Sequence, residues 1–473
     1  MSDTSLCFHS AVDLARMIRG KKVSAVEVME AHLAQIARIN PKVNAIVTMA
    51  DEGQLLDQAA QADAAVAKGA ETGPLHGLPL GVKDLVLTAG MRTTYGSRIY
   101  TDLVPGHDGL IVEREKAAGA IIVGKTNTPE FGAGGQTFNE VFGVTPNPYD
   151  LGKTCGGSSG GSAVALACGM LPLADGSDFG GSLRNPAAFC NVVGMRPSPG
   201  RVPVWPAKLG WFTLSVQGPM ARTVGDLALY FSAIAGPDAR APIAIAEPPS
   251  LFAQPLQRDF KGVRIAWSRD LGYLPVDPVI TQVCDAQRAV FEQLGCQVED
   301  AHPDLQGASD VFKTLRAWRF ALERGEELKE YRHLMKDTVI WNTEQGFKLD
   351  GPTVAKAEAR RTEFYHRMRE FLEDYEYLVL PCNPIPPFPV EQKTVTEIGG
   401  VKMATYVDAG ALRHVITIVG NPAISVPCGF TPEGLPVGLQ IVGRHQKDFE
   451  LLQIAHAFEQ ATQFHLRRPP LVD

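Results

Sequence analysis

Two serines flanked by glycines and one upstream lysine carry the side chains that acyl-transfer chemistry needs. Ser158 lies in GGSSGG (156–161), Ser182 lies in GSDFGGSLR (176–184), and Lys83 lies in HGLPLGVKD. A serine hydroxyl becomes nucleophilic when a nearby base takes its proton. A lysine can be that base when burial lowers its pKa, and Lys83 follows an apolar run. The three residues therefore predict a serine nucleophile, a relay hydroxyl and a lysine base.

Each of these motifs also has a purely structural interpretation. An isolated lysine such as Lys83 is more often exposed and would pair with the adjacent Asp84. A GGS triplet is often a flexible surface turn. Here the flanking segments SDF and LRNPAAF are apolar enough to be packed. Main-chain N–H groups around such a glycine turn can stabilise a developing oxyanion, so the context favours the catalytic interpretation.

With these motifs in hand, the chain resembles the amidase signature family along nearly its whole length. Lys83 matches the family lysine in the pattern G-[IL]-P-[VL]-x-V-K-D, Ser158 matches the bridging serine, and Ser182 matches the nucleophile. A fourth segment, GNPAISVPCGFTPEGLPVGLQIVG (420–443), resembles the C-terminal signature of the family. Four separated motifs in the family order make a chance match improbable.

The resemblance implies a role for each of these residues. Ser182 would attack the amide carbonyl while neutral Lys83 accepts a proton through Ser158. The same relay would then protonate the leaving amine, and water would hydrolyse the acyl-enzyme. The bridging serine of the family follows a cis peptide bond, which here would be Gly157–Ser158. The oxyanion hole would consist of the main-chain N–H groups of Phe179, Gly180, Gly181 and Ser182.

Other residues near the motifs are expected to support the site. Asp178 and Arg184 flank the nucleophile turn and are interpreted as a structural pair. Gly132, in FGAGGQ, matches a substrate-contacting position and would leave room for the acyl group. Phe179 is bulkier than the residue that is common at its position, but the expected oxyanion contact there comes from the main chain.

The implied activity is hydrolysis of a small-molecule carboxylic amide to a carboxylate and an amine or ammonia, with esters or carbamates as side substrates. Two alternatives remain open. One is a catalytic subunit of a glutamyl- or aspartyl-tRNA amidotransferase, which would need partner chains, ATP and tRNA. The other is an inactive binding protein on the same fold. The resemblance is also compatible with a homodimer.

Two further motifs fit other enzyme classes. The run 119–126, GAIIVGKT, fits the phosphate-loop pattern, but its variable residues are typical of a strand, and Pro129 follows closely. The run 156–160, GGSSG, fits the nucleophile elbow of a different hydrolase fold, which would make Ser158 the nucleophile and require a histidine. We expect neither, and we expect His76 to be structural.

Composition narrows the possible partners. Of 473 residues, 45 are basic and 52 acidic, giving a net charge of −7 with no basic run, which disfavours nucleic acid or an anionic membrane as partner. The eight cysteines form no C-x-x-C pair, so no metal or other cofactor is expected. There is no secretory-signal pattern and no apolar run of about 18 residues, so a cytoplasmic protein is expected.

Strands and helices alternate along the sequence, which predicts an α/β fold. Strands are expected at 77–82, 120–123, 192–195, 263–266, 377–380, 423–426 and 438–442. Helices are expected from the Ser24 capping box to Asn40, and at 59–68, 110–118, 162–169, 224–235 and 278–294. Together with the resemblance, this pattern predicts one α/β/α domain over residues 1–473, with a large twisted mixed sheet covered by helices on both faces.

Three parts of that domain are distinguished. Residues 1–70 form an N-terminal helical region, 75–200 form the signature core, and 304–373 form a variable helical region near the substrate funnel. The aromatic residues of 304–373 are expected to pack helices onto the sheet. Better candidates for pocket walls are three aromatic residues of a Pro/Gly-rich loop, Trp205, Trp211 and Phe212.

Overall fold

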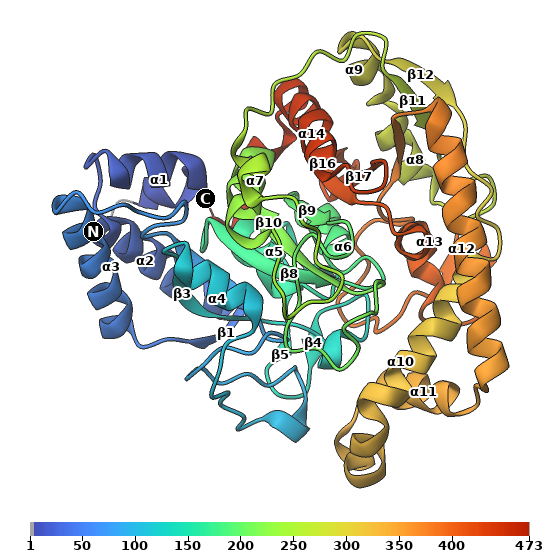
Figure 1. The fold of residues 1–473 in the computed structure, drawn as a ribbon, viewed down its shortest axis with the longest axis horizontal. Coiled ribbons are helices and arrows are strands. Elements are labelled where there is room, and N and C mark those ends of the chain that lie inside the picture. The colour runs from blue at the N-terminus through green and yellow to red at the C-terminus, as the bar shows by residue number, and fades with distance from the viewer. Residues whose placement is uncertain (1–3, 473) are drawn as a thin grey trace.

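A mixed sheet of eleven strands runs through the computed structural model, which describes residues 4–472 (Figure 1). In spatial order the strands are β1 (Ile46–Met49), β3 (Ile121–Thr126), β2 (Pro79–Lys83), β8 (Leu173–Asp178), β10 (Val216–Ala221), β9 (Val193–Arg196), β16 (Ala423–Phe430), β17 (Pro436–Val442), β13 (Tyr377–Pro381), β11 (Arg264–Trp267) and β12 (Gln297–Asp300). β2 pairs in parallel with β3 and β8, and β11 pairs in parallel with β12 and β13, whereas the other neighbours are antiparallel.

Both faces of this sheet are buried, as alternation along β13 shows. Tyr377 and Val379 belong to one hydrophobic core, whereas Leu378 and Leu380 belong to a second core. Successive side chains of a strand point to opposite faces, so the two cores lie on opposite sides of the sheet. This is the predicted three-layer α/β/α arrangement, and the expectation about fold class is confirmed.

Fourteen α-helices of the described residues cover and border the sheet. Figure 1 shows the N-terminal helices at one end of the molecule and α10 to α12 at the other. The helices are α1 (Ala11–Arg19), α2 (Ala25–Val43), α3 (Glu52–Ala67), α4 (Leu110–Ala117), α5 (Gly160–Ala167), α6 (Arg184–Phe189), α7 (Val224–Ile234), α8 (Pro278–Asp285), α9 (Arg288–Gln293), α10 (Ala308–Tyr331), α11 (Asp337–Phe347), α12 (Gly351–Asp374), α13 (Ala411–Val419) and α14 (Asp448–Thr462). Small hairpins pair β4 (Phe138–Asn139) with β5 (Gly143–Val144), β6 (Pro146–Asn147) with β7 (Asp150–Thr154), and β14 (Glu397–Ile398) with β15 (Val401–Lys402).

Several predicted helix boundaries are wrong. The capping box of α2 is present, with the Glu27 N–H donating to Ser24 Oγ at 3.0 Å, but the helix continues through Pro41 to Val43. A proline near a helix end removes only one main-chain hydrogen bond, so the last turn persists. The predicted helix 278–294 is two helices, α8 and α9, and the predicted helix 59–68 is the second half of α3.

The phosphate-loop interpretation of 119–126 is excluded by strand β3. This strand contains Gly124, Lys125 and Thr126, so no loop separates a strand from a helix at that place. Lys125 is fully buried, and its Nζ donates to the Thr88 hydroxyl at 2.8 Å and to the Val86 carbonyl. Lys125 is therefore a core residue of the sheet.

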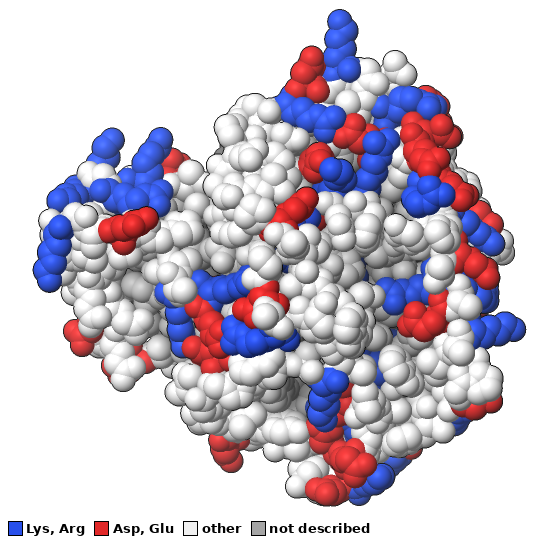
Figure 2. All heavy atoms as spheres, viewed as in Figure 1, with Lys and Arg blue, Asp and Glu red and all other residues white. Residues whose placement is uncertain are grey.

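Surface charge is mixed on the face drawn in Figure 2, where basic and acidic side chains are scattered over the centre and the right side and basic ones predominate at the upper left. Among residues 4–472, no helix combines the length and apolar character of a membrane span. The same residues contain no cluster of three or more His, Cys, Asp or Glu placed to hold a metal ion.

Candidate active site

The ends of two neighbouring strands bring the predicted catalytic segments together. Lys83 is the last residue of β2, and Asp178 is the last residue of β8, which pairs in parallel with β2. Carboxyl ends of parallel strands meet at the same edge of a sheet. Ser158 lies just before α5, a helix that packs against both strands. Lys83, Ser158 and the segment leading to Ser182 therefore converge at this edge.

Lys83 is fully buried and points its amine at three serines. Its Nζ lies 2.8 Å from Ser158 Oγ, 2.8 Å from Ser159 Oγ and 3.0 Å from Ser177 Oγ. The surface pair with Asp84 does not form, because the Asp84 carboxylate instead accepts from the Thr94 N–H at 3.0 Å and from the Thr94 hydroxyl. The lysine is therefore directed at the predicted relay serine.

Burial lowers the pKa of Lys83 from 10.5 to about 7, against the opposing charges of Asp175 and Asp178. Removing an ammonium from water disfavours its charged form. Asp175 also fixes the main chain, since its Oδ1 accepts the Lys83 N–H at 2.5 Å. A substantial share of Lys83 is thus neutral near pH 7, the state that a general base requires.

The peptide bond Gly157–Ser158 is cis. Side chains from other elements hold the surrounding loop, with Asn185 Nδ2 donating to the Gly157 carbonyl at 2.9 Å and Thr137 Oγ1 donating to the Gly156 carbonyl at 2.8 Å. At Gly160 an added Cβ would lie 2.2 Å from Thr137 Oγ1. The glycines of GGSSGG are therefore needed for close packing around Ser158.

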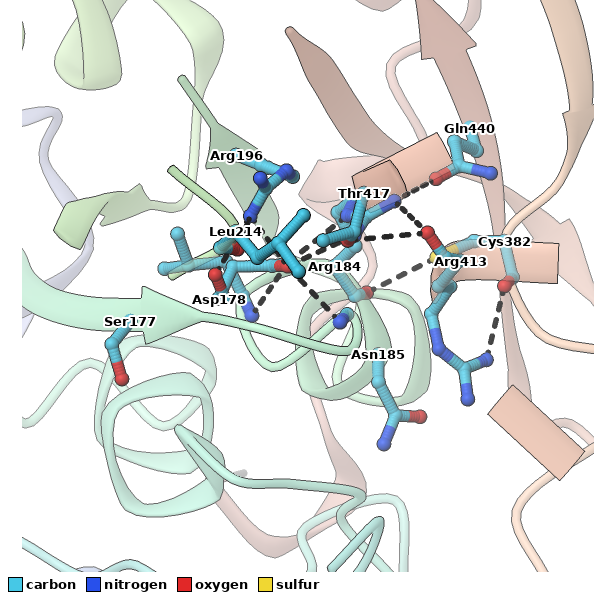
Figure 3. A network of polar contacts seen from close by, with 12 residues as sticks. Ser177, Asp178, Arg184, Asn185, Arg196, Leu214, Cys382, Arg413, Thr417 and Gln440 are labelled. Carbon is cyan, nitrogen blue, oxygen red and sulfur yellow. Dashed lines mark hydrogen bonds and ion pairs between the residues drawn. The ribbon is translucent and has the colours of Figure 1, made fainter. Parts of the chain in front are cut away.

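The turn carrying Ser182 is fixed by a buried ion-pair network behind it (Figure 3). Asp178 lies 2.9 Å from Arg184 and 3.4 Å from Arg196, and all three side chains are inaccessible to solvent. Burial raises the pKa of Asp178, but the two guanidinium groups outweigh this effect and hold the pKa below its ordinary value. The predicted structural pairing of Asp178 with Arg184 is confirmed.

Three of the four expected oxyanion donors are free in the described residues. The N–H groups of Phe179, Gly180 and Ser182 have no hydrogen-bond acceptor within residues 4–472. The N–H of Gly181 instead donates to Asp178 Oδ1 at 3.0 Å, and Gly181 lines neither cavity beside Ser182. In this structure the Gly181 N–H is thus bound by Asp178, and the oxyanion role of Gly181 stays a prediction.

Ser182 lies between two cavities. The smaller cavity, about 110 Å³, is lined by Ser182, Gly180 and residues of α10, α11 and α13. The larger cavity, about 360 Å³, is lined by Ser182, Ser158, a group of apolar and aromatic side chains, and a charged group made up of Lys208, Arg316, Arg319, Glu323 and Arg324. Between the side chains of Ser158 and Ser182 there is no direct hydrogen bond in the part of the chain that is described. Both side chains nevertheless face the same larger cavity.

Gly132 lines both cavities and adjoins Ser158, the predicted relay serine. Its φ is +70°, and a Cβ there would lie 3.3 Å from Ser158 Oγ. Of the aromatic residues expected as pocket walls, Phe212 lines the larger cavity. Trp205 and Trp211 do not: Trp205 packs under the Arg240 guanidinium, and Trp211 is 76% exposed. A Pro/Gly-rich loop turns successive side chains in different directions, which its composition does not reveal.

Sequence reasoning missed the two other serines on the lysine, Ser159 and Ser177. Ser159 lies in GGSSGG, next to Ser158, and Ser177 lies in GSDFGGSLR, next to Asp178. Their hydroxyls, so close to the predicted catalytic residues, could have indicated that they contact the lysine. Among the described residues no histidine takes the place of Lys83 at Ser158, which is evidence against the nucleophile-elbow interpretation of 156–160. His76 Nε2 contacts the Ala62 carbonyl at 3.0 Å and lies outside both cavities.

Comparison with known protein families agrees with this geometry. The model of the amidase family matches residues 27–452. The chain belongs to the amidase signature family. It is an amide-hydrolysing enzyme, and its large mixed sheet flanked by helices is the fold of its structural neighbours.

Relatives of this amidase include proteins of two kinds. An acylamidase of Rhodococcus erythropolis is 35% identical over 461 residues, covering 97% of this chain and 96% of the relative. A glutamyl-tRNA(Gln) amidotransferase subunit of Geobacillus kaustophilus is 35% identical over 502 residues, covering 99% of this chain and 100% of the relative. Among solved structures, a bacterial aryl acylamidase is 27% identical with a TM-score of 0.91, covering 97% of this chain and 98% of that one.

Proposed function

We propose that the amidase hydrolyses carboxylic amides through an acyl-enzyme on Ser182, with Ser158 as proton relay and neutral Lys83 as general base. The observation that carries this proposal is the buried Lys83 amine, 2.8 Å from Ser158 Oγ at the wall of a cavity that Ser182 also lines. A buried amine with a lowered pKa is the base that a serine nucleophile needs at neutral pH.

In the first half-reaction, Ser182 Oγ forms a bond to the carbonyl carbon as its proton passes through Ser158 to Lys83. The carbonyl oxygen becomes negative and is stabilised by the free main-chain N–H groups of Phe179, Gly180 and Ser182. The C–N bond then breaks as Lys83 returns the proton through Ser158 to the leaving nitrogen. Ser158 and Ser182 are not hydrogen-bonded to each other in the described chain, but hydrogen bonds between catalytic side chains often form or shorten only when substrate is bound.

In the second half-reaction, water attacks the acyl-enzyme and gives up a proton by the same route. The products are a carboxylate and an amine or ammonia, and Ser182 regains its hydroxyl. Esters and carbamates present the same carbonyl and a comparable leaving group, so we expect them as side substrates.

The larger cavity supports an aryl or otherwise apolar amine as the leaving group. Its wall includes Tyr95, Phe131, Phe212 and Phe320. A relative in sequence is an acylamidase, and a structural neighbour is an aryl acylamidase. A preference for small polar amines over anilines in a substrate panel would refute this assignment.

Variant kinetics on a 4-nitroanilide substrate test the proposed roles. Lys83→Met and Ser182→Ala are expected to abolish turnover, and Ser158→Ala is expected to lower kcat by about 10²–10⁴. His76→Gln is the matched control and should keep wild-type kcat, since His76 lies outside both cavities. Turnover retained by Lys83→Met and lost by a histidine variant would refute the scheme.

Similarity to amidotransferase subunits supports a second candidate function, in which the same site would release ammonia from glutamine inside a complex. The presence of Lys83, Ser158 and Ser182 at one edge of the sheet is evidence against an inactive binding protein. Activity of the purified chain by itself separates the two active candidates.

A further inference from the structure

The smaller cavity beside Ser182 carries an excess of positive charge. Four cationic residues line it, namely Arg316, Lys336, Lys393 and Arg413, and no Asp or Glu of the described chain is among its lining residues. Arg316 and Arg413 are only 7% and 6% exposed. Buried charges in proteins are normally paired or hydrogen-bonded, because leaving water is costly. An anionic group from a ligand would offset this excess.

Arg413 packs against Gly181, the residue before the proposed nucleophile, and lacks an ionic partner among the described residues. Its Nη1 donates to the Cys382 carbonyl at 3.1 Å and to Asn383 Oδ1, whereas its buried Nε has no acceptor in the same part of the chain. The side chain passes so close to Gly181 that a Cβ there would lie 2.4 Å from Arg413 Cδ. Figure 3 shows the guanidinium directed away from Asp178, whose charge is shared between Arg184 and Arg196.

The neighbouring cations are held mainly by uncharged groups. Arg316 donates to the amide of Asn342 at 3.2 Å and to the hydroxyl of Tyr406 at 3.0 Å. Lys336 Nζ donates to the Ala133 carbonyl at 3.1 Å. None of these hydrogen-bond partners carries a negative charge.

Two carboxylates approach this region from outside the cavity. Glu130 accepts the Lys336 main-chain N–H at 2.6 Å and a hydrogen bond from Ser97, and Asp408 pairs with Lys313 at 3.2 Å. Glu130 thus compensates part of the charge of Lys336, and Asp408 is already paired. The lining retains a net positive charge that is centred on Arg316 and Arg413.

The position of the relay serine indicates which part of the substrate enters this cavity. Ser158 lines the larger cavity but not the smaller one. A relay that protonates the leaving nitrogen must face it, so the amine belongs in the larger cavity and the acyl group in the smaller one. Arg316 lines both cavities, whereas the two arginines that line only the larger cavity have carboxylate partners, with Arg319 2.9 Å from Glu323 and Arg324 2.7 Å from Glu327.

We propose that the smaller cavity binds an anionic group on the acyl part of the substrate, with Arg413 as the specificity-determining residue. This inference rests on the proposed function and names its substrate class: amides of short dicarboxylic acids or of similarly anionic acyl groups. The volume of about 110 Å³ favours a chain of few carbons between the amide carbonyl and the anion.

A matched substrate pair tests the inference. The mono-4-nitroanilide of glutaric acid and its methyl ester differ in the charge of the acyl end and by one methyl group, and release of 4-nitroaniline reports cleavage of the anilide bond alone. Wild-type enzyme is expected to favour the free acid by at least about tenfold in kcat/KM. A site that binds a polar group of its substrate discriminates by this factor or more against an analogue that lacks the group. In Arg413→Met this ratio should fall several-fold through loss on the acid alone, because Arg316 remains, with partial recovery in Arg413→Lys.

A variant in the other cavity provides the control. Arg319→Met removes a cation that is paired with Glu323 on the leaving-group side, so the acid-to-ester ratio should keep its wild-type value. A wild-type preference for the ester, or an equal loss on both substrates in Arg413→Met, would overturn the inference. If the enzyme cleaves the anilide bond of the methyl ester but not that of the acid, the proposed amidase function is still supported.

Binding of the product separates failure of the inference from failure of the proposed function. Glutarate titrated calorimetrically into Ser182→Ala should bind, and its affinity should fall at least about tenfold in the double variant with Arg413→Met. This readout does not depend on turnover. Equal glutarate affinity in the two variants would overturn the role of Arg413 even if neither anilide is a good substrate.

Discussion

At the scale of single residues, the proposed chemistry depends on the protonation state of Lys83. Its amine has no carboxylate within hydrogen-bond distance in the described chain and faces only serine hydroxyls. Hydroxyls can donate to a neutral amine or accept from an ammonium, so the three serines accommodate both states of the catalytic cycle. The surrounding burial, and not a neighbouring cation, makes the neutral state accessible.

The pH profile should report this amine. Because the pKa of Lys83 is lowered to about 7, kcat/KM should rise as pH passes through 7 and level off above it. Asp175 favours the ammonium, so Asp175→Asn should move the midpoint to lower pH, and the asparagine Oδ1 can still accept the Lys83 N–H. A midpoint that is unchanged or higher in this variant would contradict the assignment of the base.

Gly132 offers a test of crowding at the relay serine. Gly132→Ala adds a methyl group 3.3 Å from Ser158 Oγ and is expected to lower kcat by at least about tenfold, since small misplacements of reacting groups are costly. Gly90→Ala is the matched control: its φ is +72°, and nothing lies within 4 Å of the added carbon. Both substitutions should cost about 1–2 kcal/mol of stability through left-handed backbone strain.

Thermal unfolding and steady-state kinetics of the two glycine variants separate these effects. The stability loss should be at least as large for Gly132→Ala, whose added carbon also lies 3.0 Å from Leu85 Cδ1, and kcat should fall only for Gly132→Ala. Equal kcat values would show that Gly132 leaves no space that the reaction uses.

At the scale of elements, the turn between β8 and α6 positions Ser182. Its conformation depends on Asp178, which binds the Gly181 N–H in front and two arginines behind. One carboxylate therefore connects the nucleophile turn to β9 through Arg196 and to α6 through Arg184. The arrangement orders the free N–H groups on either side of Gly181.

Removing this charge should destabilise the whole protein. Asp178→Asn leaves two buried guanidinium groups without their counter-charge, a change that costs about 3–5 kcal/mol in comparable buried pairs. Glu326→Gln is the control: it breaks an exposed pair with Lys329, in which the side chains are 84% and 64% exposed, and should cost less than about 1 kcal/mol. Urea unfolding followed by circular dichroism measures both changes, and equal midpoints would contradict the account.

The sequence predicted most of the sheet but missed the strand that matters most for Ser182. β8 has the sequence LADGSD, which is poor in β-branched and aromatic residues. It is a strand because β2 and β10 pair with it on both sides, a tertiary effect that overrides local propensity. The apolar strands β13, β16 and β17 were predicted because their composition is typical of buried strands.

The same distinction holds for the site. Lys83, Ser158 and Ser182 were predictable because each lies in a contiguous motif. Arg413 was not, because it comes from α13 and reaches Gly181 only in the folded chain. Likewise, the donor of Gly181 looked available in the sequence, and only the folded turn shows that Asp178 has taken it.

At the scale of the whole molecule, one chain holds the complete proposed machinery. The base, relay, nucleophile and both cavities come from residues of this chain. Helices α10 and α11 contribute lining residues such as Phe312, Phe320 and Thr338, so the segment 304–373 borders both cavities. A reaction that needs no partner chain is therefore expected.

Activity of the isolated chain tests this expectation. The purified protein should hydrolyse 4-nitroanilides without ATP, tRNA or any partner chain, and adding ATP and tRNA should leave the rate unchanged. Release of ammonia from glutamine that requires those additions, with no anilide turnover, would instead favour a role within an amidotransferase complex. Size-exclusion chromatography with light scattering on the same sample would determine whether a homodimer forms.

The most direct test of the central proposal is the site of covalent labelling by a fluorophosphonate. Intact mass should show one adduct, and peptide mapping should place it on Ser182, with no adduct in Ser182→Ala and slower labelling in Lys83→Met. An adduct on Ser158 in the wild-type protein, or labelling of Ser182→Ala at the wild-type rate, would contradict the assignment of Ser182 as nucleophile.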